Sequence, residues 1–203
     1  MLKKALTCAA VAIVIASVAP GCSDPEPATP QVIIESEALS PGGSDGSQKC
    51  QVTGSWINIG TFADITDAGT DPKPRPVPNG STEPTGKVDI SCKVEPKGDG
   101  FDVALSATIS GADGGTITIV GQMKPNKAEK QTGIRVTFSK RDRGSFIQPD
   151  CEVDYNVNRD AGIAAGRVWG EVRCGAAKDD NLDRTCAFRA QFRFENCSQA
   201  PPQ

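Results

Sequence analysis

The chain has 203 residues, of which 22 are basic and 25 acidic, and its formal net charge at pH 7 is −3. An acidic chain lacks the basic surface that nucleic-acid binding requires, so we expect no nucleic-acid partner. The chain contains no histidine, which excludes Ser-His-Asp and Cys-His catalytic arrangements. We therefore assign no catalytic residue and no cofactor.

The first 21 residues have the pattern of a cleaved export signal. Lys3 and Lys4 precede an apolar run from Ala5 to Val18. At about 14 residues, this run is shorter than the ~20 needed to span a bilayer. We predict a signal peptide over residues 1–21.

The end of this leader, Ala19-Pro20-Gly21-Cys22, resembles a bacterial lipobox. The resemblance implies cleavage before Cys22, a diacylglycerol on its sulfur and an acyl chain such as palmitate on the new amino terminus. Ser23 is similar to the outer-membrane sorting signal of many Gram-negative lipoproteins. We expect a lipid-anchored protein of the cell envelope, in the outer rather than the inner membrane. An ordinary secretory signal is the alternative.

The mature chain would carry 20 basic and 25 acidic residues, a net charge of −5. It has no polybasic patch for an anionic membrane surface, so the lipid must anchor it. Residues 22–49 are rich in Pro, Gly, Ser, Asp and Glu, which is typical of a flexible tether. Within it, only Val32–Ile34 could pair, as an edge strand. We predict a folded domain over 50–197 and a disordered tail over 198–203.

Six cysteines remain once Cys8 leaves with the leader and Cys22 carries the lipid. An even number in an exported chain predicts three disulfides. Zinc is the alternative, but the chain has neither Cys-x-x-Cys spacing nor histidine. The six are Cys50, Cys92, Cys151, Cys174, Cys186 and Cys197.

Apolar and polar residues alternate along eight segments, which is the period of strands buried on one face. No segment has a helical apolar stripe. Because short turns join most of these strands, we predict an all-β fold, an antiparallel sandwich or barrel stapled by disulfides. The strands are expected within residues 50–60, 88–94, 101–109, 115–123, 134–138, 151–157, 166–174 and 186–196.

Residues 63–86, which are rich in proline and glycine, and residues 175–185 are predicted to form long exposed loops. Each loop carries three aspartates that could offer oxygen ligands to calcium. Neither set matches an EF-hand, and turn capping explains aspartates in loops equally well, so we assign no metal site and keep calcium as an alternative. The two sets are Asp64, Asp67 and Asp71, and Asp179, Asp180 and Asp183.

The segment from Lys49 to Gly60 resembles the first strand of avidin-like barrels, in which Gly-x-Trp opens the barrel and a nearby Asn reaches the ligand. Lipocalin barrels also open with Gly-x-Trp. The matching residues here are Gly54, Trp56 and Asn58. The resemblance implies a calyx for a small ligand. The alternative is that Trp56 plugs one end of an ordinary core.

The last two strands can be aligned if Cys174 faces Cys186 across an antiparallel pair. Non-hydrogen-bonded neighbours bring Cα atoms to about 4.5 Å, within disulfide range. We therefore predict a Cys174–Cys186 disulfide and leave the pairing of the other four cysteines open. This register places Val172 opposite Phe188 and Val168 opposite Phe192 on an apolar face.

The other face of this hairpin places an indole among charged side chains, and we expect it to be partly exposed. In this register Glu171 lies opposite Arg189, Trp169 opposite Gln191 and Arg167 opposite Arg193. Such a group suits a sugar or a protein hot spot, and simple packing is the alternative. The candidate binding residues are Trp169, Arg167, Glu171, Arg189 and Gln191.

The ending CAFRAQFRFENC, residues 186–197, resembles a pattern in uncharacterised myxobacterial lipoproteins, which implies no known activity. We expect a cell-envelope lipoprotein with a non-catalytic domain that binds a protein, a glycan or a small ligand. A structural subunit of an envelope assembly is the alternative. A hydrolase built on paired carboxylates is the third hypothesis.

Overall fold

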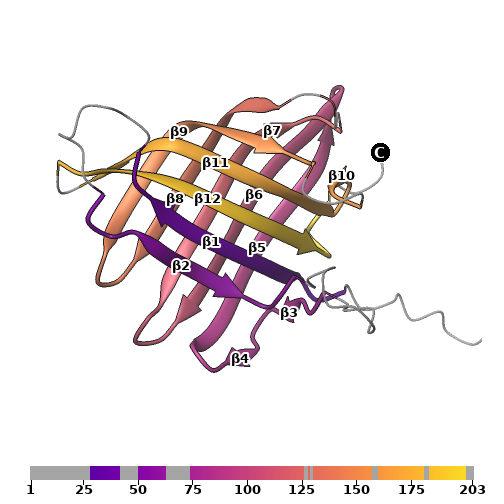
Figure 1. The fold of residues 1–203 in the computed structure, drawn as a ribbon. Helices are drawn as coiled ribbons and strands as arrows, with labels where there is room; N and C mark the ends of the chain where they lie inside the picture. Colours follow the sequence, from indigo (N-terminus) through magenta and orange to yellow (C-terminus); the bar gives the residue numbers. More distant parts are fainter. Residues whose placement is uncertain are drawn as a thin grey trace, which may run out of the picture.

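The computed structural model describes residues 28–41, 50–62, 74–125, 128, 130–156, 160–180 and 183–199. Over these residues the chain forms one twelve-stranded antiparallel sheet and no helix (Figure 1). The all-β prediction is confirmed, with twelve strands in place of about eight. The strands are β1 (Gln31–Leu39), β2 (Gly54–Ile59), β3 (Val77–Pro78), β4 (Thr82–Glu83), β5 (Gly86–Lys97), β6 (Gly100–Ser110), β7 (Gly115–Met123), β8 (Gln131–Lys140), β9 (Gly144–Asp154), β10 (Gly162–Ala164), β11 (Arg167–Asp179) and β12 (Thr185–Glu195).

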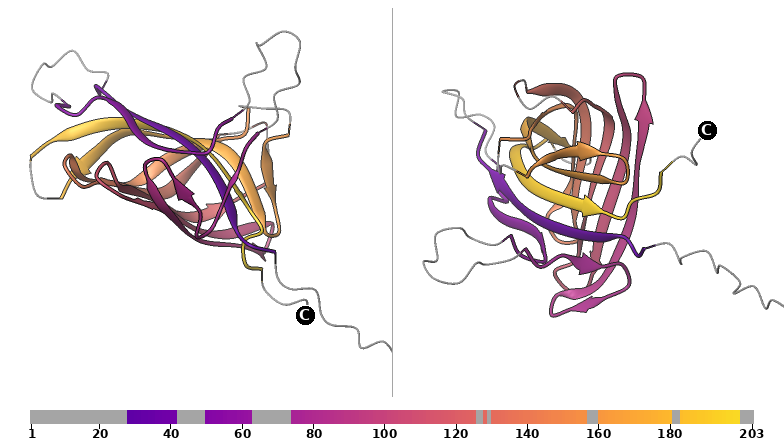
Figure 2. Two further views of the ribbon diagram at one scale, coloured as in Figure 1. Left: turned by 90° about the horizontal axis from the view of Figure 1, so that it is seen from below. Right: turned by 90° about the vertical axis from the view of Figure 1, so that its right-hand side faces the viewer.

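The sheet curls into a nearly closed barrel. Its order is β2-β1-β12-β11-β9-β8-β7-β6-β5-β4, with β10 beside β11 and β3 beside β1. Figure 2 shows the strands wrapped around a common interior. The two ends of the sheet, β1 and β2 on one side and β4 and β5 on the other, face each other across a seam. A strap, residues 77–83, links the two sides of this seam. Its strand β3 pairs with the start of β1, while Gly80 N donates to Val88 O on β5 and Val88 N donates to Ser81 O, both at 2.8 Å.

The segment after β12 closes a second part of the seam. Ser198 N donates to Cys92 O at 3.0 Å, and Val94 N donates to Ser198 O at 3.1 Å, so this segment pairs with β5. The predicted tail over 198–203 therefore begins too early, because Ser198 is part of the folded domain. A barrel that covers its strand edges in this way leaves fewer backbone groups for pairing with other chains.

Strand β1 corrects the predicted tether and domain boundary. Residues 31–39 lie between β2 and β12, with Val32, Ile34 and Ala38 buried in the core. The folded domain thus begins near Gln31 instead of residue 50. The composition of the Pro- and Gly-rich flanks does not indicate this strand, although Val32, Ile34 and Ala38 lie on one face with the period of two of a strand.

The two predicted long loops are also shorter than expected. Strands β3 and β4 lie within 63–86, and β11 continues to Asp179 before β12 begins at Thr185. The extension of β11 is held by Ala177, which is buried opposite Cys186. A bulge between Cys174 and Ala177 allows the strand to keep pairing.

Three disulfides join the six cysteines from Cys50 to Cys197, as predicted in number, but the predicted Cys174–Cys186 bond is wrong. The bulge shifts the β11–β12 register, so that Cys174 lies opposite Phe188. Cys174 instead bonds to Cys151 on β9, its other neighbouring strand, with a Cα–Cα distance of 4.6 Å. This distance is that of a non-hydrogen-bonded cross-strand pair. The other bonds are Cys50–Cys186 and Cys92–Cys197.

The β11–β12 register differs from the predicted one by two residues. Val172 pairs with Ala190, Gly170 with Phe192 and Val168 with Phe194. Because side chains in a strand alternate with a period of two, a two-residue shift leaves each of them on the predicted face. The assignment of faces therefore survives although the residue pairs change.

Candidate functional site

Large side chains pack the interior of the barrel. Phe138 stacks on Phe188 with 4.3 Å between ring centroids, and Trp56 packs edge-on against Phe188 at 5.1 Å and Phe146 at 5.7 Å. Trp56 is only 1% exposed, so it plugs the core. Asn58 is exposed, and its amide Nδ2 donates to Ser55 Oγ. Asn58 therefore does not reach into the barrel interior, although the resemblance to avidin-like barrels implies this for the residue at this position.

The outer face of β11 and β12 carries an aromatic cluster around Trp169. Trp169 is half-buried and lies opposite Arg193, whose guanidinium carbon is 5.0 Å from the indole centroid. Phe62, just after β2, stacks on the same indole at 5.9 Å with the ring planes 20° apart. Trp169 is thus half-buried on the face opposite Phe192, in agreement with the predicted partial exposure, and it also packs against the core.

Hydrogen bonds hold both neighbours of the indole in place. Arg193 Nη2 contacts Glu195 Oε1 at 2.6 Å, and Gln31 Nε2 donates to Glu195 Oε2 at 2.9 Å. We call Phe62, Trp169, Arg193, Glu195 and Gln31 the Trp169 patch.

The backbone around Phe62 is equally constrained. The N–H of Phe62 donates to Glu35 Oε1 at 3.2 Å. Before it, Gly60 has a φ of +67°, and a Cβ there would lie 2.5 Å from Arg75 O. The turn that delivers Phe62 to the indole thus requires glycine at position 60.

A buried carboxylate lies in the next row of the same face. Glu171 is 1% exposed, and its Oε2 accepts from Arg189 Nε at 2.7 Å. Arg173 Nη2 pairs with the other oxygen, Oε1. The bond to Glu171 is the largest of the effects that raise the pKa of Arg189. Two half-exposed arginines thus shield Glu171 from water, and we assign this carboxylate a role in stabilising the fold.

The predicted binding residues lie on one face, as expected, but they do not form one group. Arg167 is exposed opposite Ala164 of β10, and Gln191 lies opposite Glu171. Glu171 and Arg189 belong to the ion-pair network, and Trp169 belongs to the aromatic cluster. Phe62 was missed because its contact with Trp169 joins distant parts of the chain, which alternation cannot indicate.

The described aspartates that were considered as calcium ligands do not form a metal site. Asp179 pairs with Arg184, whose Nε donates to Asp179 Oδ2 at 3.0 Å. In the part of the chain that the structure describes, no three His, Cys, Asp or Glu side chains gather as a metal site. Asp64, Asp67 and Asp71 lie outside the described residues, as does Cys22.

No family model, curated protein or solved structure matches this chain. The assignment of function therefore depends on the residues and their geometry.

Across the described ranges, we find no helix with the length and apolar character needed to cross a bilayer.

Proposed function

We propose that this chain is a lipid-anchored protein of the cell envelope that binds a protein partner through the Trp169 patch. The leader and Cys22 support the anchor, with the outer membrane as the expected location. The three disulfides agree with an oxidising compartment outside the cytoplasm.

The contact of Trp169 with both Phe62 and Arg193 carries the proposal for binding. Tryptophan and arginine are enriched at the centres of protein interfaces, where a rigid aromatic group loses little entropy on binding. Here the Glu195 and Glu35 carboxylates already hold the groups around the indole. A protein partner fits better than a sugar, because Phe62 and Arg193 already cover part of the ring surface on which a sugar would stack.

The anchor is tested by mass spectrometry of the mature protein. The wild type should carry a diacylglycerol on Cys22 and float with membranes, whereas Cys22→Ala should lack the lipid mass. Equal mass and equal flotation of the two proteins would refute the anchor.

Binding is tested by a photo-reactive residue at Arg167, which is exposed and two residues from Trp169. In cells that make the full chain, illumination should give one protein adduct, and Arg193→Ala should lower its yield about tenfold, as expected for a hot-spot residue. Arg135→Ala, on the outer face of β8, is the matched control and should change the yield less than about twofold. A photo-reactive residue at Val120, exposed on β7, should give no such adduct. A glycan adduct, or equal yields from the two positions, would contradict a protein partner at this patch.

A further inference from the structure

The chain is fixed in the folded domain very soon after Cys22. Thr29 O accepts from Asn196 Nδ2 at 3.0 Å, and Pro30 O accepts from Asn79 N at 2.8 Å. Thr29 is the first residue with such a bond in the described part of the chain, and six residues, 23–28, separate it from Cys22. Fully extended, the seven steps from Cys22 to Thr29 reach about 24 Å, and a flexible chain of this length averages about 15 Å.

The Trp169 patch lies at this same end of the barrel. Gln31, the first residue of β1, pairs with Glu195, and Ile33 pairs with Arg193, which in turn pairs with Trp169. The patch is thus within about 7 Å of the start of β1 along the strand.

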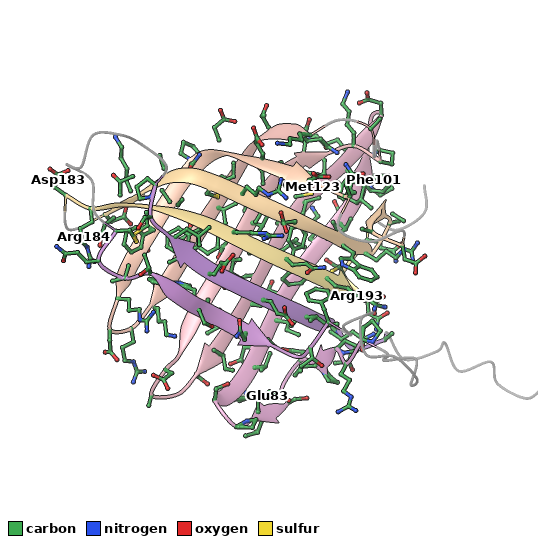
Figure 3. The ribbon with its side chains drawn as sticks, in the orientation of Figure 1. Glu83, Phe101, Met123, Asp183, Arg184 and Arg193 are labelled. Carbon is green, nitrogen blue, oxygen red and sulfur yellow. A yellow bond between two sulfur atoms is a disulfide. The ribbon has the colours of Figure 1, made fainter. Side chains whose placement is uncertain are left out.

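The second tryptophan, Trp56, lies towards the opposite end of the barrel. Trp56 packs on Phe188, which pairs with Ala38. Ala38 is seven residues beyond Gln31, or about 24 Å along β1. Figure 3 shows Arg193 and Arg184 at opposite ends of the molecule, and Arg184 lies over Phe146, which also contacts Trp56.

We propose that the end where β1 begins faces the lipid surface, and that the partner of the Trp169 patch is a protein held in the same membrane. This inference rests on the proposed anchor at Cys22. A short tether keeps the patch near the lipid, where a membrane-held partner has a high effective concentration. The lipid itself is a poorer occupant, because the guanidinium of Arg193 is paired with Glu195 and the aromatic rings are half-buried.

The orientation is tested with the two tryptophans of the chain. The lipidated full chain is placed in vesicles that contain a dansyl-headgroup lipid, and energy transfer to dansyl is measured for the wild type and for Trp169→Phe. This substitution replaces one half-buried aromatic side chain on the outer face of β11 with another and leaves Trp56 as the remaining donor. Transfer should fall strongly in Trp169→Phe, and a 20-residue Gly/Ser spacer after Asp24 should lower the wild-type signal. Unchanged transfer in either variant would overturn the orientation.

The partner is tested with the photo-reactive residue at Arg167 in the same spacer variant. Lengthening the tether from six to 26 residues should lower the yield of the protein adduct about tenfold, since effective concentration falls with roughly the −3/2 power of linker length. A soluble adduct partner, an adduct to lipid, or a yield that does not change with the spacer would overturn the proposal, whereas no adduct at all would refute the proposed binding at the Trp169 patch. Loss of the lipid mass at Cys22 would instead refute the proposed anchor, so the two failures are distinguishable.

Discussion

Glu171 Oε2 accepts two contacts from the Arg189 guanidinium, from Nε at 2.7 Å and from Nη2 at 2.6 Å, across β11 and β12. The carboxylate is 1% exposed, whereas the arginine side chain is 51% exposed. The pair therefore combines a desolvated acceptor with a donor that water still reaches. Removing the acceptor should therefore cost more than breaking a surface ion pair, because the groups around a desolvated carboxylate lose a charged partner.

Glu171→Gln should lower the free energy of unfolding by about 1–2 kcal/mol, because it removes a charged acceptor from two arginines that can turn to water. Urea denaturation measures this change. Asp89→Asn is the matched control, since Asp89 pairs with Lys87 at 3.2 Å with both side chains more than half exposed. An equal or larger effect of Asp89→Asn would show that Glu171 stabilises the fold no more than a surface ion pair does.

Tyr155 should titrate abnormally. Burial, the larger effect, raises its pKa to about 12, and the Gln131 amide, which also bonds the Lys124 backbone, acts in the opposite direction. Because the folded pKa lies above the unfolded value of about 10, the stability linked to Tyr155 is fully present below pH 10 and is lost as the pH rises to about 12. The loss should be about 3 kcal/mol.

The chain contains one tyrosine, so ultraviolet absorbance of tyrosinate reports this group directly. In Tyr155→Phe, the part of the alkaline loss of stability that belongs to Tyr155 should disappear, while the part due to lysines remains. A tyrosinate midpoint near pH 10 in the folded protein would contradict a buried hydroxyl.

The Cys92–Cys197 bond should contribute more stability than Cys151–Cys174. Their sequence separations are 105 and 23, for which loop-closure entropy suggests about 5 and about 3 kcal/mol. Paired Cys→Ala variants, compared by urea denaturation, test this order. Hydrogen exchange should also rise at Val94 N in the Cys92/Cys197 variant, because its partner Ser198 is no longer tied to β5. Protection that stays unchanged would mean that the segment after β12 holds this seam without the disulfide.

Ser36→Ala should destabilise the barrel by about 1–3 kcal/mol. Ser36 Oγ donates to Ile57 O at 2.8 Å and accepts from Ile57 N at 2.9 Å, where the β1–β2 register shifts. Alanine would leave both backbone groups buried without this partner. Ser106→Ala, on the half-exposed outer face of β6, should cost little. Similar costs for the two substitutions, measured by thermal unfolding, would show that water replaces the hydroxyl of Ser36.

The sequence by itself determined which face of each strand is buried. Val168, Gly170 and Val172 turn inward and Trp169 turns outward because this alternation is a local property of an extended chain. The number of disulfides also followed from composition, since an even count of six cysteines in a chain predicted to be exported gives three pairs.

Tertiary structure alone decided which segments are neighbours. Cys174 has an apolar strand on each side, and only the bulge before Ala177 and the position of β9 select Cys151 over Cys186. Phe62 reaches Trp169 because the barrel brings β1 and its neighbour β2 beside β12 and β11. Such pairings depend on closing the whole sheet, and the free energy of closure is shared by contacts far apart in the chain, so no single segment encodes it.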